Sequence, residues 1–204
     1  MLFPLFLKGL LFGFLLAATV GPMWILCLRR TLAQGPLVGF ASGMGIAVAD
    51  GFYGTIAAFG IAAVSDLLLR YSFWIGLVGS VFLIYLGMKI LLSRPSLENQ
   101  AEEKSSLHKA FLSTLGLTLA NPPTILAFAA IFAGLGLASA ADYRAAALVV
   151  AGVFLGSASW WTILPAGAGA FRRRIGPRLF RAINVVSGLS ILGFALWQVA
   201  ALMR

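Results

Sequence analysis

The chain has 204 residues, of which 61% are hydrophobic and only 10% are charged. Soluble domains carry about 25% charged residues, so this composition indicates an integral membrane protein and excludes a disordered chain. Cys27 is the only cysteine, which excludes a disulfide-built secreted domain, a cysteine-cluster metal site and a dithiol redox carrier. The net charge of +9 comes from basic residues at the ends of apolar runs. It therefore indicates membrane topology and contact with anionic lipids rather than nucleic-acid binding.

Six long apolar stretches separate the charged residues along the chain. A helix needs about 20 residues to cross the hydrocarbon core of a bilayer, and each stretch is long enough for one crossing. The runs are solidly apolar and do not alternate, which favours helices over barrel strands. The sequence therefore predicts six transmembrane helices, over residues 5–28, 37–63, 71–92, 111–136, 145–168 and 182–202.

A polar segment divides these helices into two groups of three. We predict a first three-helix repeat over residues 1–92, a cytoplasmic linker over 93–109 and a second three-helix repeat over 110–204. Because each half has an odd number of helices, the second half inserts upside down relative to the first, which is the inverted-repeat plan of many secondary transporters. The expected fold is an all-α integral membrane protein with two inverted repeats.

Lys and Arg are concentrated in the loops that follow the first, third and fifth predicted helices. Arg29 and Arg30 follow the first helix, and the arginines at 172–174 follow the fifth. Loops rich in Lys and Arg stay in the cytoplasm. We therefore predict that these loops are cytoplasmic and that both termini are periplasmic.

Helix-breaking residues fall at matching places in the two halves. Gly21-Pro22 lies in the first predicted helix and Asn121-Pro122 in the fourth, so the two prolines are one hundred positions apart. A proline inside a helix removes a backbone hydrogen bond, and in lipid the freed carbonyl needs another partner. Paired breaks point to a substrate site at the interface of two repeats. The alternative is that both prolines only kink their helices.

Asp50 is the only ionisable residue well inside a predicted span. Placing such a charge at mid-membrane costs about 2.5–3.5 kcal/mol on insertion scales, so the side chain must face a cavity or a partner, or carry a proton. Two functional roles fit: a proton carrier for coupling, or a counter-ion for a substrate ammonium group. The structural alternative is a hydrogen-bonded Asp near a helix break, since Gly45, Gly51 and Gly54 surround it.

The remaining residues predict no enzyme activity, no cofactor and no metal site. His108 is the only histidine and lies in the linker, and the chain has no Ser/His/Asp set, no paired carboxylates in a span and no Walker A sequence. Trp160 and Trp161 lie within the fifth predicted helix. They either pack in the core or line a substrate pocket.

Several motifs, in this order and spacing, resemble the LysE/RhtB family of bacterial amino-acid exporters over essentially the whole chain. The residues that carry the resemblance are Gly21-Pro22 followed by an arginine-bearing turn and Gly35, Gly43 and Gly45 before Asp50, Gly76 to Gly79 followed by Tyr85-Leu86-Gly87, Asn121-Pro122, and Arg181, Asn184 and Gly188 in the last helix.

The resemblance implies a six-helix exporter of amino acids or related small metabolites in the bacterial inner membrane, often a homodimer. It implies export driven by the proton or ion gradient without ATP, with the bilayer, protons and a small-molecule substrate as partners. Gly21, Pro22, Asp50, Asn121 and Pro122 match the breaks and the acid of the family. Lysine and arginine exporters of the family tend to carry polar residues after Gly-Pro, whereas this chain has Met23-Trp24, which favours a neutral or hydrophobic amino acid.

Two other functions stay open at this point. A divalent-cation exporter of similar architecture requires several carboxylate, His or Cys ligands inside the membrane, and one Asp and one Asn are too few unless a dimer pools them. A non-transporting membrane assembly protein has no need of an intramembrane acid, so replacing Asp50 by Asn would leave its activity intact. A membrane enzyme is a weaker alternative, because the catalytic set is missing.

Overall fold

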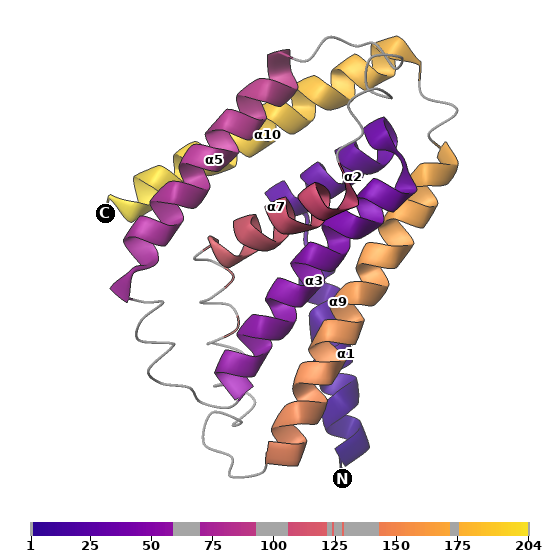
Figure 1. Ribbon diagram of the computed structural model, residues 1–204, viewed down its shortest axis with the longest axis vertical. Coiled ribbons are helices and arrows are strands. Elements are labelled where there is room, and N and C mark those ends of the chain that lie inside the picture. Colours follow the sequence, from indigo (N-terminus) through magenta and orange to yellow (C-terminus); the bar gives the residue numbers. More distant parts are fainter. Residues whose placement is uncertain are drawn as a thin grey trace.

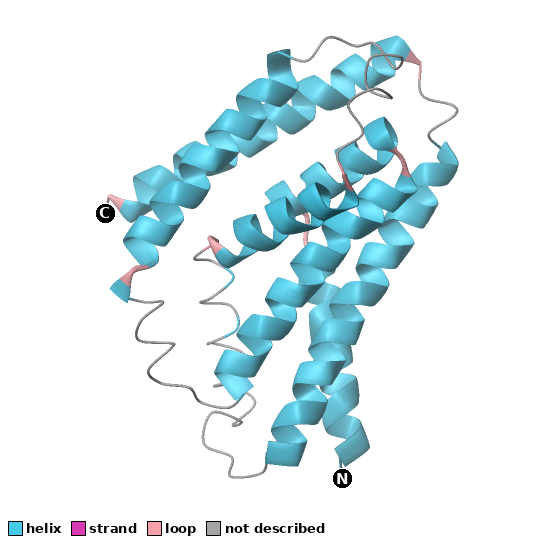
Figure 2. Ribbon diagram, viewed as in Figure 1, coloured by secondary structure: helices cyan, strands magenta, loops and turns pink. Residues whose placement is uncertain are grey.

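The computed structural model describes residues 2–58, 70–92, 106–121, 124, 128, 143–171 and 176–203. All regular structure in these parts of the chain is helical (Figure 2), which confirms the all-α prediction for them. Seven helices are described: α1 (Leu2–Ala18), α2 (Pro22–Gln34), α3 (Pro36–Ala58), α5 (Ser72–Leu92), α7 (Leu107–Leu119), α9 (Tyr143–Phe171) and α10 (Pro177–Leu202).

The first predicted helix, 5–28, is wrong as a single element. α1 ends at Ala18 and α2 begins at Pro22, and the two helices are bent by 73° at the break between them. Pro22 has no N–H group to satisfy, so it fits the first turn of a new helix, and Gly21 before it has an extended backbone. The Gly21-Pro22 pair therefore interrupts the helix completely instead of kinking it.

Arg29 and Arg30 lie inside α2, so the prediction that they occupy a cytoplasmic loop is also wrong. A charged pair after an apolar run usually marks a membrane boundary, but here α2 continues to Gln34. The chain turns only at Gly35, whose φ of 108° lies in the left-handed region that favours glycine. Pro36 then starts α3. The arginines stay helical because acceptors on neighbouring helices bind their guanidinium groups.

Four of the described helices are long and apolar enough to cross a membrane: α3, α5, α9 and α10. The bent pair of α1 and α2 makes a fifth candidate if it forms one broken span. α7 begins at Leu107, where the Ser106 side chain accepts a hydrogen bond from the Lys109 N–H. Half of the fourth predicted helix, 111–136, lies outside the described residues. The described parts are those of a multi-pass membrane protein.

Glycines allow α1 and α9 to pack in contact while running in the same direction (Figure 1). A Cβ atom on Gly13 would overlap the backbone of Val153, and one on Gly156 would overlap the Leu10 carbonyl oxygen. Small residues at an interface let two helix backbones approach closely, which is how helices gain packing energy in lipid.

α3 lies between α9 and α7 and joins them through polar contacts. It crosses α9 in the antiparallel sense but runs in the same direction as α7 (Figure 1). The Thr114 hydroxyl donates to the Ser42 carbonyl at 2.6 Å, and the Tyr53 hydroxyl donates to the Leu119 carbonyl at 2.6 Å. These bonds hold α7 along the length of α3.

α5 and α10 form an antiparallel pair beside this group (Figure 1). They cross at Gly87 and Gly188, where a Cβ on Gly87 would lie 3.2 Å from the Gly188 carbonyl oxygen. Leu83 and Ile191 pack in one buried cluster at this interface, together with Leu26 of α2. The pair is thereby joined to the rest of the molecule mainly through α2.

Candidate functional site

Asp50 lies within α3 with its side chain only 3% exposed. Ser157 of α9 donates its hydroxyl hydrogen to Asp50 Oδ2 at 2.7 Å. Among the described residues the carboxyl group has no ion pair. Sequence reasoning missed Ser157, because a lone serine in an apolar helix gives no signal until its partner is known.

A cluster of buried side chains joins this part of α3 to the break between α1 and α2. This junction cluster has a core made of Ala17, Cys27, Ile46, Ala47 and Trp161. Ala47 lies one helical turn before Asp50, and Ala17 lies in the last turn of α1. Trp24, just after the break, and Trp160 both pack against the core. The structure therefore brings Asp50, the Gly21-Pro22 break and Trp160 into one neighbourhood.

The break leaves backbone groups of both helices without helical partners. The Ile25 N–H donates to the Gly21 carbonyl at 3.0 Å, so the N–H groups of Met23 and Trp24 precede the first bond of the helical ladder. Gly21 offers no side-chain cap for them. The N-terminus of α2 consequently carries a partial positive charge suited to a carboxylate, and the C-terminus of α1 carries a partial negative charge suited to an ammonium group.

Three indole N–H groups at the junction cluster have no acceptor among the described residues. They belong to Trp24, Trp160 and Trp161. Trp160 packs edge-on against Phe14 in α1, with ring centroids 5.3 Å apart. Leaving a buried donor unsatisfied costs about 1–3 kcal/mol, so these three indoles are candidate donors to a bound acceptor. Trp160 is thus both a packing residue and a candidate lining residue.

Arg29 and Arg30 tie α2 to three other helices. Arg30 is 9% exposed and donates to Ser42 Oγ at 3.0 Å, to the Ala110 carbonyl at 3.1 Å and to Ser113 Oγ at 2.9 Å. Arg29 Nε donates to Asn184 Oδ1 at 2.9 Å. All of these acceptors are neutral. The guanidinium groups therefore act as a bracket that holds α2 against α3, α7 and α10.

Replacing Arg30 by Lys should destabilise the protein although it preserves the charge. A lysine ammonium lacks the planar fork that reaches two hydroxyls and a carbonyl at once, so we expect a loss of about 1–3 kcal/mol in the free energy of unfolding. Thermal unfolding in detergent measures the effect. Arg178→Lys, at the exposed start of α10, is the control and should change stability by less than about 0.5 kcal/mol. Equal stability of both variants would contradict the bracket.

The second predicted break begins at the end of α7, where the chain contacts α5. α7 ends at Leu119, and Asn121 donates from Nδ2 to Thr124 Oγ1 at 3.0 Å. Ala120 lies against Gly79 of α5, because a Cβ there would lie 2.8 Å from the Ala120 carbonyl oxygen. Pro122 lies outside the described residues. The structure thus places Asn121 beside α5, whereas Gly21 and Asp50 lie near α9.

A groove of about 430 Å³ runs between α3 and α9 on another face of the molecule. Its lining is Val48, Gly51, Thr55, Ala147, Val150, Ala151 and Phe154. None of the predicted site residues contributes to it. An open apolar groove on transmembrane helices has the chemistry of a lipid-facing crevice, so it is not the place for a charged solute.

Two curated proteins are similar to the chain over most of its length. The chain is 26% identical over 198 residues to "Putative amino acid efflux protein YcgF" of Bacillus subtilis (strain 168), which covers 95% of this chain and 94% of that protein. It is 29% identical over 173 residues to "Uncharacterized membrane protein YahN" of Escherichia coli (strain K12), which covers 82% of this chain and 77% of that protein. No solved structure matches the chain.

The family comparison covers nearly the whole chain. The model of the LysE type translocator family matches residues 14–200, a range that includes the break, Asp50, Arg29 and Arg30, and most of α10. A match of this extent establishes the family, and its members are transporters rather than enzymes. The chain therefore belongs to the LysE type translocator family of membrane transporters.

Proposed function

We propose that this protein exports amino acids or related small metabolites across the bacterial inner membrane in exchange for protons. The substrate binds at the break between α1 and α2, with Asp50 beside it. The observation that carries this proposal is a buried carboxyl that has no ion pair among the described residues and lies one helical turn from the cluster at the α1–α2 break. The family membership and the name of the Bacillus relative support export of amino acids.

Asp50 supplies the charge chemistry of the proposed site. An isolated carboxylate at this depth is costly unless a cation or a proton neutralises it. Arg29 and Arg30, the cations of the neighbouring α2, are bound to other acceptors. A substrate ammonium group and a proton are therefore the available partners, and competition between them at one carboxyl couples export to proton entry.

The opposite end of an amino acid fits the other half of the break. The first N–H groups of α2 and the indole N–H groups of Trp24 and Trp161 are donors without acceptors among the described residues. A substrate carboxylate would satisfy them. The apolar and aromatic character of the junction cluster favours a neutral or hydrophobic amino acid over a basic one.

The helix contacts support an arrangement of two inverted repeats. In this arrangement the α1–α2 pair, α3 and α5 form the first repeat, and α7, α9 and α10 belong to the second. The α1–α2 pair is then equivalent to α7, α3 to α9, and α5 to α10. Under this equivalence the α1–α9 contact corresponds to the α7–α3 contact. Both are contacts between helices running in the same direction (Figure 1). The α3–α9 and α5–α10 contacts map onto themselves and are both antiparallel. Rocking of one repeat against the other would then alternate access to the break.

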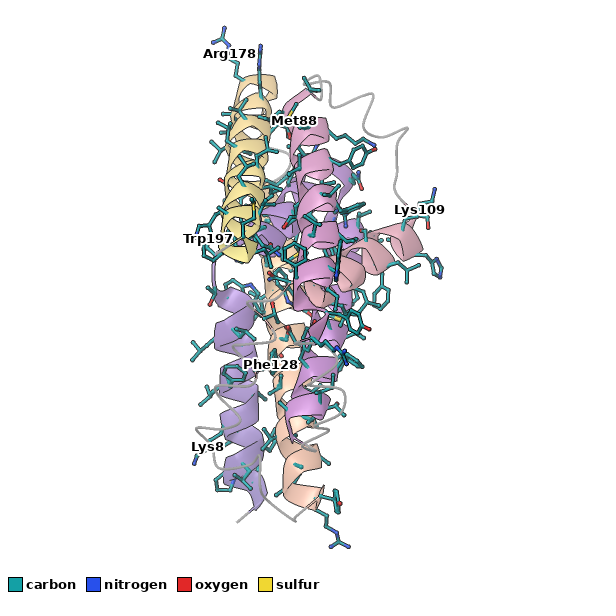
Figure 3. The ribbon with its side chains drawn as sticks, turned by 90° about the vertical axis from the view of Figure 1, so that its left-hand side faces the viewer. Lys8, Met88, Lys109, Phe128, Arg178 and Trp197 are labelled. Atoms are coloured by element: carbon teal, nitrogen blue, oxygen red, sulfur yellow. The ribbon has the colours of Figure 1, made fainter. Side chains whose placement is uncertain are left out.

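The charge distribution supports the proposed orientation. Lys8 and Arg178 lie at opposite ends of the molecule (Figure 3), and Arg178 belongs to the end that the positive-inside rule assigns to the cytoplasm. Both termini are then periplasmic. A homodimer, as the family resemblance implies, would leave the proposed site of each protomer complete.

Efflux from proteoliposomes tests this function. Vesicles loaded with a panel of labelled amino acids should release a neutral or hydrophobic one faster when a pH gradient is imposed than when it is collapsed by an uncoupler. Failure to release any amino acid from well-folded protein would refute the proposal. Divalent cations would be tested next, and a non-transporting assembly role after them.

Replacing Trp24 by Phe should weaken substrate binding without harming the fold. The change removes one unpartnered N–H group and keeps an aromatic ring, so a lost hydrogen bond of about 1 kcal/mol predicts a rise of about fivefold in the KM for efflux. Stability should be equal or higher, because a buried unsatisfied donor is removed. Trp197→Phe, on the exposed face of α10 (Figure 3), is the control. An unchanged KM in Trp24→Phe would show that the Trp24 indole N–H does not bind the substrate.

A further inference from the structure

Six buried side-chain atoms in the described part of the chain lack a hydrogen-bond partner. Three are nitrogen atoms and three are oxygen atoms. The three nitrogens are the indole donors at the junction cluster. The three oxygens are Ser80 Oγ, Asn121 Oδ1 and Gln198 Oε1. The oxygens come from α5, the segment after α7, and α10, and the proposed substrate site uses none of them. The two amide oxygens can only accept, and the Ser80 hydroxyl can accept as well as donate, so all three can bind a cation, which the indoles cannot do through N–H.

Ser80 and Gln198 face each other across the α5–α10 interface. Gln198 donates from Nε2 to the Gly76 carbonyl at 3.5 Å, so its amide group lies at the turn of α5 that precedes Ser80. The crossing at Gly87 and Gly188 leads to the same pairing. Gln198 lies ten residues after Gly188, and because the helices are antiparallel it should face α5 about ten residues before Gly87, which is close to Gly76. Ser80 is fully buried and Gln198 is 3% exposed.

Asn121 reaches the same stretch of α5 from α7. Its neighbour Ala120 contacts Gly79, the residue adjacent to Ser80. The Asn121 amide nitrogen bonds to Thr124, which leaves Oδ1 as the free acceptor. The C-terminus of α7 also directs its carbonyl groups and its partial negative charge toward this place. α5, α10 and the segment after α7 thus each carry an unpartnered oxygen near the turn of α5 that runs from Gly76 to Ser80.

Ser80 differs from several other buried hydroxyl groups among the described residues. In a transmembrane helix a Ser or Thr hydroxyl commonly donates to the carbonyl four residues earlier. Thr31, Ser42 and Thr118 do so at 2.8–2.9 Å, and Ser157 donates to Asp50 instead. The Gly76 carbonyl accepts a hydrogen bond from Gln198, and Ser80 makes no bond to it. The Ser80 hydroxyl thus has no partner among the described residues, and its oxygen lone pairs are available to a cation.

The donor set selects a monovalent cation. Hydroxyl, amide and carbonyl oxygens are hard ligands that replace the hydration shell of an alkali ion, and helix C-termini at a break hold Na⁺ in secondary transporters. Ca²⁺ and Mg²⁺ are usually held by carboxylates, and all three of these side chains are neutral. An ammonium group would use the same acceptors, but Asp50 already offers it a carboxyl at the other break.

We propose that Ser80, Gln198 and Asn121 form a binding site for Na⁺ between α5, the end of α7 and α10, separate from the substrate site. The ion is held by the three side-chain oxygens, and carbonyl oxygens at the end of α7 complete its shell. The proposal does not depend on the identity of the exported substrate, because the ion binds without it.

Thermal unfolding of the purified protein in detergent tests this site without any transport measurement. Na⁺ is titrated against choline at constant ionic strength, in the absence of amino acids. A ligand at ten times its Kd should raise the Tm by about 3–6 °C. The increase should be absent in Ser80→Ala and in Gln198→Leu, and it should persist in Ser159→Ala, an exposed serine of α9 bonded to its own helix.

The Na⁺-free state gives a second readout with the opposite sign. Without the ion, Ser80→Ala removes an unsatisfied buried hydroxyl, so its Tm should equal or exceed that of the unchanged protein. The variant is thus expected to fold, and the comparison stays interpretable. A Tm of the unchanged protein that ignores Na⁺, or a Na⁺ response that survives in Ser80→Ala and Gln198→Leu, overturns the proposal. The first result would also indicate a structural water at these oxygens.

The same titration separates the ion from the substrate. If methylammonium stabilises the protein through Ser80 and Na⁺ does not, the site takes the ammonium group of a substrate and the Na⁺ assignment is wrong. Loss of proton-driven efflux in Asp50→Asn would leave the Na⁺ titration unaffected. Failure of the proposed function and failure of the Na⁺ site are therefore distinguishable.

Discussion

Replacing Asp50 by Asn is expected to reduce gradient-driven efflux to the level of protein-free vesicles. Asparagine has nearly the same shape and still accepts the hydrogen bond from Ser157, which lies 2.7 Å away in the native protein. It bears no charge and binds no proton at neutral pH. The variant should fold at least as well as the unchanged protein, because a buried acid without an ion pair is replaced by a neutral group. The initial efflux rate under an imposed pH gradient measures the effect.

Exchange without a gradient tells the two roles of Asp50 apart. If Asp50 only carries the proton, Asp50→Asn should still exchange labelled for unlabelled substrate when the pH is equal on both sides. If Asp50 pairs with the substrate ammonium group, exchange should be lost as well. Ser157→Ala is the companion variant: it keeps the carboxyl and removes the hydrogen bond that Ser157 donates to it, so efflux should slow without being abolished. Normal gradient-driven efflux by Asp50→Asn would refute the proposed mechanism.

Replacing Gly156 by Ala should be the most damaging small substitution in α9. The added methyl group would overlap the Leu10 carbonyl oxygen and lie 2.8 Å from the Phe14 nitrogen. Both are backbone atoms, so a rotamer change cannot relieve the clash and α1 must move away. Overpacking of this kind costs about 1–3 kcal/mol, occasionally more. We expect a lower Tm in detergent and a lower yield of folded protein.

Gly167→Ala on the same helix is the matched control and should have the opposite sign. A Cβ at Gly167 meets nothing within 4 Å, and alanine favours a helix over glycine by about 1 kcal/mol. Its Tm should therefore be equal to or higher than that of the unchanged protein. If Gly156→Ala were as stable as Gly167→Ala, the close contact between α1 and α9 would be wrong.

The contact between α1 and α9 also links stability to the proposed site. α1 ends four residues after Phe14, directly before the break, and Phe14 packs against Trp160. A displacement of α1 would therefore shift the carbonyl end that faces the substrate. Residual Gly156→Ala protein should show a higher KM for efflux, whereas Gly167→Ala should keep the native value.

The local composition of the sequence is sufficient to predict much of the helical structure of this protein. Apolar runs of about 20 residues, bounded by Lys and Arg, are sufficient to predict α3, α5, α9 and α10, because lipid admits only helices whose backbone groups are bonded internally. The Gly21-Pro22 pair predicts an interruption for a local reason, since proline has no N–H group to donate. Asp50 is conspicuous for the same kind of reason, because an acid in an apolar run is costly wherever the helix packs.

Only the tertiary structure decided which of these features meet. Arg29 and Arg30 carry the composition of a loop, yet they are helical because Ser42, Ala110, Ser113 and Asn184 from three other helices bind them. Ser157 becomes a site residue only because α9 crosses α3 at Asp50. The matched prolines predict one shared site, and this stays a prediction because Pro122 lies outside the described residues. Hydrogen bonds between residues far apart in the sequence depend on how the helices pack. The sequence pattern of one helix predicts which of its faces is apolar, but it does not predict which helix packs against that face.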